Sequence, residues 1–447
     1  MSSEWPLVSI DNIKATRSGS IAIGPFGSRM KSDCYVSNGV RVVRGTNLTG
    51  GRSFSGDFVF ITPEKAEELN SANLLPNDLV FPHRGAIGEV GIVPNDGERY
   101  VLSSSMMKLT CAADGAHPDF IYYFFKSEAG RFELLKNASQ VGTPGIGQPL
   151  TSLKQIKLKL PPVDEQRSIA AALRALDDRI ALLRETNATL EAIAQALFKS
   201  WFVDFDPVRA KSQGQPPAGM DEATAALFPD SFEESALGLV PKGWSVQPVG
   251  DAVECVGGAT PDTKDPSYWS PEEHAWTTPK DLSGLPAPVL LSTERRLSTK
   301  GVAKIGSGLL PVGTLLMSSR APIGYLAIAQ VPLAINQGYI AMPPGSLLPP
   351  LYMLFWCRQN MEGIKARANG STFMEISKKA FRPIPALVPS SPAIKAFLAV
   401  ASPLFARLVS NEQQAQSLAT IRDTLLPRLI SGQLRLPEAL VEIEEAA

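Results

Sequence analysis

One stretch of the chain reads Leu74-Leu75-Pro76-Asn77-Asp78-Leu79-Val80 and continues into Arg84-Gly85-Ala86-Ile87-Gly88. The pattern returns as Leu309-Leu310-Pro311-Val312-Gly313-Thr314-Leu315-Leu316, followed by Arg320-Ala321-Pro322-Ile323-Gly324. Each copy precedes a segment with apolar residues at helical spacing, and five positions recur at one constant offset: Leu176, Ile180, Leu190, Ile193 and Leu197 match Leu404, Leu408, Leu418, Ile421 and Leu425. An offset this long exceeds the period of stacked repeat arrays. It predicts a duplicated globular domain followed by a helix, and such a duplication favours a split target over a single catalytic cleft.

The duplication predicts an α+β fold with a pseudo-two-fold internal repeat. We expect globular copies at residues 1–160 and 241–390, helices at 161–203 and 391–433, a Pro- and Gly-rich linker at 204–240 and an acidic tail at 434–447 that frays after Pro437. Within the copies, sequence pattern predicts strands at Val40–Val43, Leu79–Phe81 and Val90–Val93, and helices at Asp119–Phe132 and Pro350–Met361.

The two long helices carry a heptad-like apolar seam with one polar residue in each. The first seam runs through Ile169, Leu173, Leu176, Ile180, Leu183, Asn187, Leu190, Ala194 and Leu197, and the second through Ile394, Phe397, Ala401, Leu404, Leu408, Asn411, Ala415, Leu418 and Leu425. A buried Asn can fix register and orientation, so Asn187 and Asn411 predict two helices that pair in one defined register. The alternative is that each helix packs only on its own domain.

The ends of these helices are predicted from single residues. Asp164 is the expected N-cap of the first helix, after Pro161-Pro162. In the second helix, Pro403 either kinks the helix or marks its start, with Ser402 as N-cap.

Composition argues for a reducing cytoplasm and against a membrane. The four cysteines are far apart and form no C-x-x-C pair, which disfavours both a zinc site and a disulfide framework. No signal peptide opens the sequence, and no apolar run of about 18 residues is present. We therefore expect a cytoplasmic protein with no membrane partner.

Net charge becomes informative when it is divided among the segments. Residues 1–160 carry 17 Lys and Arg against 15 Asp and Glu, and residues 240–390 carry 14 against 10. Residues 161–239 carry 7 against 13, and residues 391–447 carry 5 against 6. Mildly basic domains fit modest phosphate contact, so a chain that binds double-stranded DNA this way would need a partner to supply further backbone contacts.

Signatures of catalysis are absent from the sequence. There is no phosphate-binding G-x-x-x-x-G-K-[ST] loop, no dinucleotide-binding G-x-G-x-x-G after a strand and no adenine-methylating [DN]-P-P-[YF] tetrapeptide. The histidines His83, His117 and His274 lack metal-ligand spacing and are expected at the surface or in loops. The pattern favours a binding protein with no catalytic residue and no metal site.

Polar residues that recur at matching places are the candidates for DNA contact. Arg84 and Arg320 each follow a strand and precede a turn, and Arg suits bidentate contact with guanine or phosphate; a structural salt bridge is the alternative. Ser103 to Ser105, centred on Ser104, occupy the place of Asn336 and Gln337. These short side chains either read base edges or complete turns.

An ordered set of motifs across the whole chain resembles the specificity (S) subunits of type I restriction-modification systems. In the first copy these are Gly24-Pro25-Phe26-Gly27-Ser28, Gly39-Val40-Arg41-Val42-Val43-Arg44-Gly45-Thr46-Asn47-Leu48 and Pro161-Pro162-Val163-Asp164-Glu165-Gln166-Arg167. In the second copy they are Gly258-Ala259-Thr260-Pro261-Asp262-Thr263-Lys264, Trp276-Thr277-Thr278-Pro279-Lys280-Asp281-Leu282, the segment 310–324 and Leu425-Leu426-Pro427-Arg428-Leu429-Ile430-Ser431-Gly432. The second helix lacks the Glu-Gln-Arg start and has Ser391-Pro392-Ala393 instead.

The resemblance implies a division of labour. Two target recognition domains would each read half of a split, asymmetric DNA sequence, and Lys280 joins the candidate contact residues because it lies in such a motif. Two antiparallel spacer helices would bind two methyltransferase (M) subunits, which hold S-adenosylmethionine. Restriction (R) subunits would add ATP- and Mg-dependent translocation and cleavage in phage defence, while this chain itself would hold no cofactor.

Three alternatives remain open from the sequence. The chain could be a specificity component of another DNA-modifying or phage-defence complex, a coiled-coil scaffold that reads no bases, or a self-contained methyltransferase. The missing methylation tetrapeptide disfavours the last.

Overall fold

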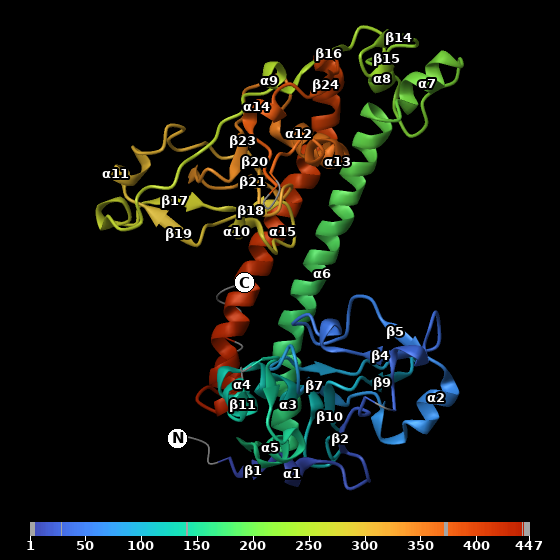
Figure 1. Cartoon of the computed structure of the whole chain (residues 1–447), viewed down its shortest axis with the longest axis vertical. Helices are drawn as coiled ribbons and strands as arrows, with labels where there is room; N and C mark the ends of the chain where they lie inside the picture. The colour runs from blue at the N-terminus through green and yellow to red at the C-terminus, as the bar shows by residue number, and fades with distance from the viewer. Residues whose placement is uncertain (1–4, 28, 140–141, 371–373, 440, 442–447) are drawn as a thin grey trace. The chain divides into compact units, whose positions relative to one another are not determined.

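The computed structural model describes residues 5–27, 29–139, 142–370, 374–439 and 441. It divides into two compact units, one formed by Met1–Ile180 with Ser417–Ala447 and the other by Ala181–Gln416. Each unit holds one globular copy, here called the first domain and the second domain, and part of each long helix (Figure 1). These helices are α6 (Val163–Phe202) and α15 (Ser391–Ser431).

The first domain is built on a mixed sheet of order β3-β5-β4-β9-β6, with β4 and β9 parallel, and an antiparallel sheet of order β2-β10-β7-β8. Its strands are β1 (Leu7–Ser9), β2 (Ile21–Ile23), β3 (Tyr35–Val36), β4 (Val40–Val43), β5 (Val59–Ile61), β6 (Asn73–Leu74), β7 (Leu79–Pro82), β8 (Gly91–Ile92), β9 (Tyr100–Leu102), β10 (Met106–Leu109), β11 (Ala138–Ser139), β12 (Gly145–Ile146) and β13 (Lys157–Lys159). Its helices are α1 (Ile10–Ile13), η1 (Ser32–Cys34), η2 (Gly45–Asn47), α2 (Pro63–Glu68), η3 (Asn70–Ala72), α3 (Pro118–Lys126), α4 (Glu128–Leu135) and α5 (Pro149–Gln155).

The second domain repeats this plan. A three-stranded sheet has the order β19-β17-β22 with β17 and β22 parallel, and a four-stranded sheet has the order β18-β21-β20-β23. The strands are β16 (Ser245–Pro248), β17 (His274–Thr277), β18 (Val289–Leu290), β19 (Arg295–Leu297), β20 (Leu315–Ser318), β21 (Leu326–Ala329), β22 (Leu333–Ile335), β23 (Tyr339–Met342) and β24 (Pro385–Val388). The helices are α9 (Val249–Ala252), η4 (Pro266–Tyr268), α10 (Pro279–Leu282), α11 (Thr299–Val302), α12 (Pro350–Gln359), α13 (Met361–Lys365) and α14 (Lys378–Phe381).

The repeat holds at the level of single hydrogen bonds. Asn77 has a φ of 69° and donates its N–H to the carbonyl of Val93 at 3.0 Å. Gly313, at the equivalent position of the second domain, has a φ of 85° and donates to the carbonyl of Ala329 at 2.8 Å. Both Asn and Gly tolerate this left-handed conformation, so the two turns that precede β7 and β20 are equivalent.

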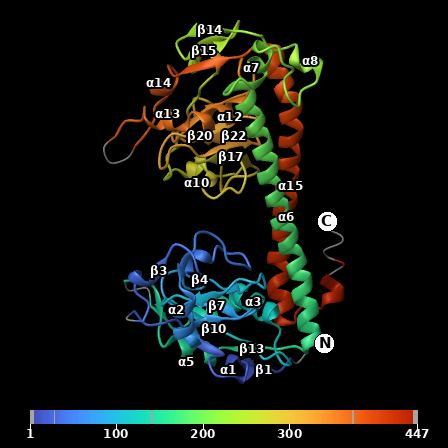
Figure 2. The same ribbon diagram turned by 90° about the vertical axis from the view of Figure 1, so that its right-hand side faces the viewer.

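The helices α6 and α15 lie side by side and antiparallel within each unit (Figures 1 and 2). In the first unit, Glu165 and Asp177 of α6 pair with Arg435 and Arg422 respectively. In the second unit, the rings of Phe198 and Phe397 meet edge to face with centroids 5.8 Å apart. The alternative that each helix packs only on its own domain is therefore wrong, because each helix contacts its partner directly.

Both helices fall within the predicted ranges 161–203 and 391–433, but the start signals read from single residues are not where the helices begin. The first starts at Val163, so Asp164 lies in its first turn rather than at the N-cap, where its charge still complements the helix dipole. The second starts at Ser391 and continues through Pro403 without a break in helix assignment. Pro403 therefore does not mark the start, and the Ser390 hydroxyl accepts the backbone N–H of Ala393 near the helix start.

Residues 204–240 are folded, which corrects their interpretation as a linker. They contain α7 (Asp206–Ser212), α8 (Glu222–Ala225) and the hairpin of β14 (Phe232–Ser235) with β15 (Gly238–Pro241). Val208 and Phe228 are buried in one apolar cluster with Trp201 of α6 and Trp244. The prolines and glycines of this segment indicate turns, but they do not indicate that its apolar residues pack into the core.

The start of the predicted tail also packs onto its unit. Leu434 and Ala439 are buried in the core of the first unit. The Arg435 guanidinium lies 5.6 Å from the centroid of the Trp5 ring. The prediction of fraying after Pro437 is therefore wrong at Ala439, and residues 440 and 442–447 lie outside the described part of the chain.

Two further elements differ from the sequence predictions. The helix expected at Asp119–Phe132 is two helices, because Ser127 breaks α3 and caps α4 by accepting the N–H of Gly130 at 3.2 Å. Likewise, a second short helix, α13, follows α12. The strand expected at Val90–Val93 is shorter, since β8 covers only Gly91–Ile92.

By length and composition alone, α15 is apolar enough to span a membrane. Its apolar residues have another role, however, since Phe397, Ala401 and Leu408 are buried against other parts of the second unit. We therefore assign α15 to the helix pair and its cores.

Candidate nucleic-acid interface

Arg84 lies at the exposed end of β7, against a returning hairpin. Its backbone forms an antiparallel bridge with Gly145 of β12, and the next residue, Gly85, donates its N–H to the carbonyl of Pro144 at 2.9 Å. The side chain lines an open surface depression of about 440 Å³ together with Thr143. Among the described residues, its guanidinium has no ion pair. Arg84 is thus exposed beside an open depression and available to a ligand.

Arg320 occupies the equivalent place after β20 but has different surroundings. Its backbone forms an antiparallel bridge with Glu375, and its Nη1 lies 3.7 Å from the Glu375 carboxylate. The two arginines are therefore equivalent in backbone position and unequal in charge environment. Contact with DNA by Arg320 would compete with this ion pair.

The other candidate residues lie just before the strands that pair with β7 and β20, namely β10 and β23. Ser104 is exposed just before β10, and its carbonyl contacts the Nε2 of the buried His83 at 3.1 Å. Burial lowers the pKa of His83. His83 therefore lies in the loop after β7, as one of its two expected positions has it, but it is buried near Arg84 rather than at the surface.

Asn336 completes a turn in the second domain. Its Oδ1 accepts the N–H of Gly338 at 2.8 Å, two residues on. The next residue, Gln337, is exposed and accepts a hydrogen bond from the Thr260 hydroxyl at 2.6 Å. By backbone hydrogen bonds, Ser103 corresponds to Asn336, because their N–H groups donate to the carbonyls of Val43 and Thr277 respectively. Gln337 is thus the counterpart of Ser104.

Lys280 lies on α10 with its side chain 77% exposed. Its Nζ is 2.8 Å from the Glu294 carboxylate. Exposed pairs of this kind contribute little stability. The lysine therefore remains accessible, although its charge is partly compensated.

Asn187 and Asn411 meet in the interior of the helix pair. Asn411 Nδ2 donates to Asn187 Oδ1 at 3.0 Å, and both side chains are buried. Glu412 lies beside them; burial raises its pKa, while Arg184 and Asn187 oppose the rise. The contact ties one position of each helix to the other, as a register-fixing pair does.

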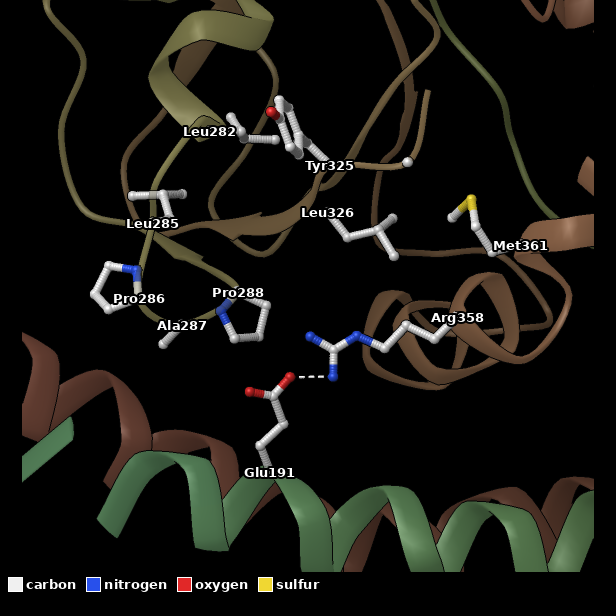
Figure 3. A pocket seen from close by; sticks show the side chains of 11 residues that line it. Glu191, Leu282, Leu285, Pro286, Ala287, Pro288, Tyr325, Leu326, Arg358 and Met361 are labelled. Atoms are coloured by element: carbon white, nitrogen blue, oxygen red, sulfur yellow. Dashed lines mark ion pairs between the residues drawn. The ribbon is translucent and has the colours of Figure 1, made fainter. Parts of the chain in front are cut away.

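Polar contacts also join each domain to its helices. In the first unit, the Asp177 carboxylate accepts from the Tyr123 hydroxyl and from Arg422, both at 2.7 Å. In the second unit, Arg358 of α12 forms an ion pair with Glu191 of α6, at the base of a groove of about 350 Å³ (Figure 3). These contacts fix the orientation of each domain on the helix segment of its own unit.

The sequence indicates both arginines as candidates but not their surroundings. By strand register, Arg84 lies opposite Ser104, and Arg320 lies opposite Gln337, the neighbour of Asn336, because β7 pairs with β10 and β20 pairs with β23. Glu375 was missed, since it is distant from Arg320 along the chain and no local pattern links the two. Only the backbone pairing of the folded chain brings this carboxylate to the arginine.

Two equivalent α+β domains on paired helices, with candidate contact residues at matching strand ends, define an internally duplicated protein with one candidate contact face in each domain. A family model described as "Type I restriction modification DNA specificity domain" matches residues 26–192 and 241–416. These ranges cover most of the chain, which therefore belongs to the family of type I restriction-modification DNA specificity subunits.

Individual relatives are similar over different lengths. The HindI specificity subunit of Haemophilus influenzae is 27% identical over 391 residues, covering 78% of this chain and 84% of the relative. The MjaIX specificity subunit of Methanocaldococcus jannaschii is 35% identical over 189 residues, covering 42% and 43%. The crystal structure of a type I S subunit from M. genitalium shares the fold, with a TM-score of 0.57, 17% identity and 96% coverage of each chain.

We expect the two arginines to respond differently to substitution. Arg84→Ala should cost about 1–3 kcal/mol of discrimination at one half-site if Arg84 contacts a base edge. Arg320→Ala should affect only the other half-site. Competition binding with duplexes altered in one half-site measures both effects in the complex with M subunits.

Glu375→Gln supplies the matched control for Arg320. If Arg320 reads DNA, this variant keeps or raises affinity because it releases the guanidinium. Equal loss of unfolding free energy in Arg320→Ala and Glu375→Gln, with normal discrimination in both, would instead assign the pair to the fold.

Proposed function

We propose that this chain reads a bipartite, asymmetric DNA target, one half with each domain, and docks two M subunits and the R subunits of a type I restriction-modification complex. The observation that carries the proposal is the duplicated domain. Equivalent strand ends present Arg84 with Ser104 in one copy and Arg320 with Gln337 in the other. Different side chains on one scaffold favour two different half-sites.

Affinity for DNA is expected to depend on the partners. The whole chain carries a net charge of −1, whereas duplex binding rests largely on phosphate neutralisation. Positively charged residues of M subunits on both sides of the duplex would supply the phosphate neutralisation that the net charge of this chain does not provide. The helix pair is the proposed docking element for those subunits.

Chemistry is assigned to the partners. The sequence has no methyltransferase or nucleotide-binding motif, and among the described residues no group of three His, Cys, Asp or Glu side chains could hold a metal. In the proposal, S-adenosylmethionine belongs to M, and ATP and Mg belong to R. The chain acts in the cytoplasm, where the DNA and these partners are present.

Binding measurements with and without M subunits test this proposal. The purified chain should bind any duplex weakly, and addition of M subunits should give a specific complex roughly 10³-fold or more tighter on target than on unrelated DNA. Its affinity should fall steeply with salt. Tight specific binding by the chain alone would contradict the need for M, and a complex that never distinguishes target from unrelated DNA would indicate a scaffold.

A further inference from the structure

Two short helices, α2 and α11, are equivalent in the two domains. The Thr62 hydroxyl caps α2 by accepting the N–H of Lys65 at 3.2 Å. The Ser298 hydroxyl caps α11 in the same way, by accepting the N–H of Gly301 at 3.1 Å. Each helix follows a sheet strand that ends just before the cap, β5 at Ile61 and β19 at Leu297. The offset in sequence between the two caps equals that between the two candidate arginines, so positions can be compared one by one.

The charge of this element is reversed between the domains. Residues 59–68 carry Glu64, Glu67 and Glu68 against Lys65, a net charge of −2. The equivalent residues 295–304 carry two arginines and two lysines without a carboxylate, a net charge of +4. Glu64 and Glu68 therefore stand where Lys300 and Lys304 stand in the second domain. This difference in charge, confined to one short element, exceeds the difference between the whole domains.

The positive residues form a compact surface cluster with aromatic rings. The Nζ atoms of Lys300 and Lys304 lie 5.2 and 5.7 Å from the centroid of the Tyr268 ring. The Arg295 guanidinium lies 3.7 Å from the centroid of the Trp269 ring. We call these five residues the lysine–aromatic cluster. Figure 1 shows α11 at the outer edge of the second domain, beyond β17 and β19.

The two lysines of the cluster lie near one carboxylate, that of Asp265, but form no close ion pair with it. In the described part of the chain, neither Lys300 nor Lys304 has a carboxylate oxygen within 4.0 Å. Lys300 donates to the Ser267 hydroxyl at 2.7 Å. The nearby Asp265 carboxylate is bound to the backbone and hydroxyl of Ser267. Three cations are thus held at the surface, and the single carboxylate of Asp265 compensates the two lysines only in part.

We propose that the lysine–aromatic cluster contacts DNA phosphates beside the half-site read by the second domain, and that α2 makes no such contact. This inference rests on the proposed function. Phosphate contacts position a protein on the duplex without reading sequence, and lysine serves this role as a point charge. The aromatic rings fix the Arg295 and lysine stems. The two domains therefore differ in anchoring as well as in the bases they read.

The test uses the complex with M subunits and a fluorescent duplex containing its target. Dissociation constants are measured from roughly 50 to 200 mM salt for the wild type and for Lys300→Gln/Lys304→Gln. Each lost phosphate contact reduces the salt slope of log K by about 0.9, so the double variant should lower it by about 1.8. The preference for both half-site sequences should be unchanged.

Two matched variants locate the effect. Lys242→Gln/Lys379→Gln removes the same charge from exposed positions outside both the cluster and the helix pair, and should leave the slope unchanged. Glu64→Lys/Glu68→Lys places the lysines on α2 and should steepen the slope. A wild-type slope in the cluster variant, or an equal change in the Lys242/Lys379 control, would overturn the inference and favour another partner, such as an acidic protein surface. If the wild-type complex does not distinguish its target from unrelated DNA, that result would instead overturn the proposed function.

Discussion

Asp78→Ala is expected to destabilise the first domain by about 3–5 kcal/mol, because it leaves a buried lysine without its counter-charge. Asp78 is fully buried and accepts from the Thr110 hydroxyl at 2.5 Å and the Leu75 N–H at 3.0 Å. The Lys108 Nζ lies 3.5 Å from the same carboxylate. Burial lowers the pKa of Lys108, and the charge of Asp78 opposes this shift. Urea unfolding of the chain measures the loss.

The residues at the equivalent positions of the second domain indicate a double variant that should restore the stability lost in Asp78→Ala. Thr314 and Ala341 occupy the places of Asp78 and Lys108, since Lys108 pairs with Val80 and Ala341 pairs with the equivalent Leu316. Both neutral residues are fully buried. Asp78→Thr/Lys108→Ala should therefore recover most of the stability lost in Asp78→Ala. A double variant as unstable as the single one would show that the cost lies elsewhere.

Four residues inserted after Arg184 and four after Glu412 should lengthen the unread gap of the target by one or two base pairs. α6 has 40 residues, about 60 Å at 1.5 Å per residue, and the insertion adds about 6 Å. B-DNA rises about 34 Å per 10 base pairs. Because four residues are close to one turn, the apolar seam stays nearly in phase. Methylation of a duplex library with varied gaps measures the preference.

The two insertion points keep the known pairs together. Asn187 with Asn411 and Asp177 with Arg422 each lie on one side of both insertions, so neither contact is broken. Single insertions are the control and should impair assembly, since they offset one seam against the other. An unchanged gap in a folded, active double insertion would show that the helices do not set the spacing.

The parts of the fold predicted from sequence are those with local or periodic signals. The repeat and the helix seams follow from apolar residues at fixed spacing, and the proline at the first position of α3 and α12 marks both helix starts. Helix starts predicted from a single residue were less reliable than elements predicted from periodic spacing. Asp164 has the chemistry of an N-cap, yet Pro161-Pro162 lets the helix start at Val163.

Features that depend on distant contacts were not predictable. The segment 204–240 reads as a linker because proline and glycine dominate it, while its order comes from the packing of Phe228 on Trp201 and Trp244. Among the candidate site residues, the surroundings of Arg320 depend on Glu375, which the fold alone brings near. The charge reversal between α2 and α11 was present in the sequence, and the matching caps of the two helices show that the aligned residues are structurally equivalent.

Methylation-sensitive sequencing of the DNA of a host that carries this chain with its M partner tests the central claim most directly. We expect one modified motif made of two unrelated half-sites, each about 3–5 base pairs, at a fixed separation. Exchange of residues 241–390 for the second domain of a relative should change one half-site only. A contiguous motif, or a change in both half-sites after the exchange, would contradict two independent reading domains on a fixed spacer.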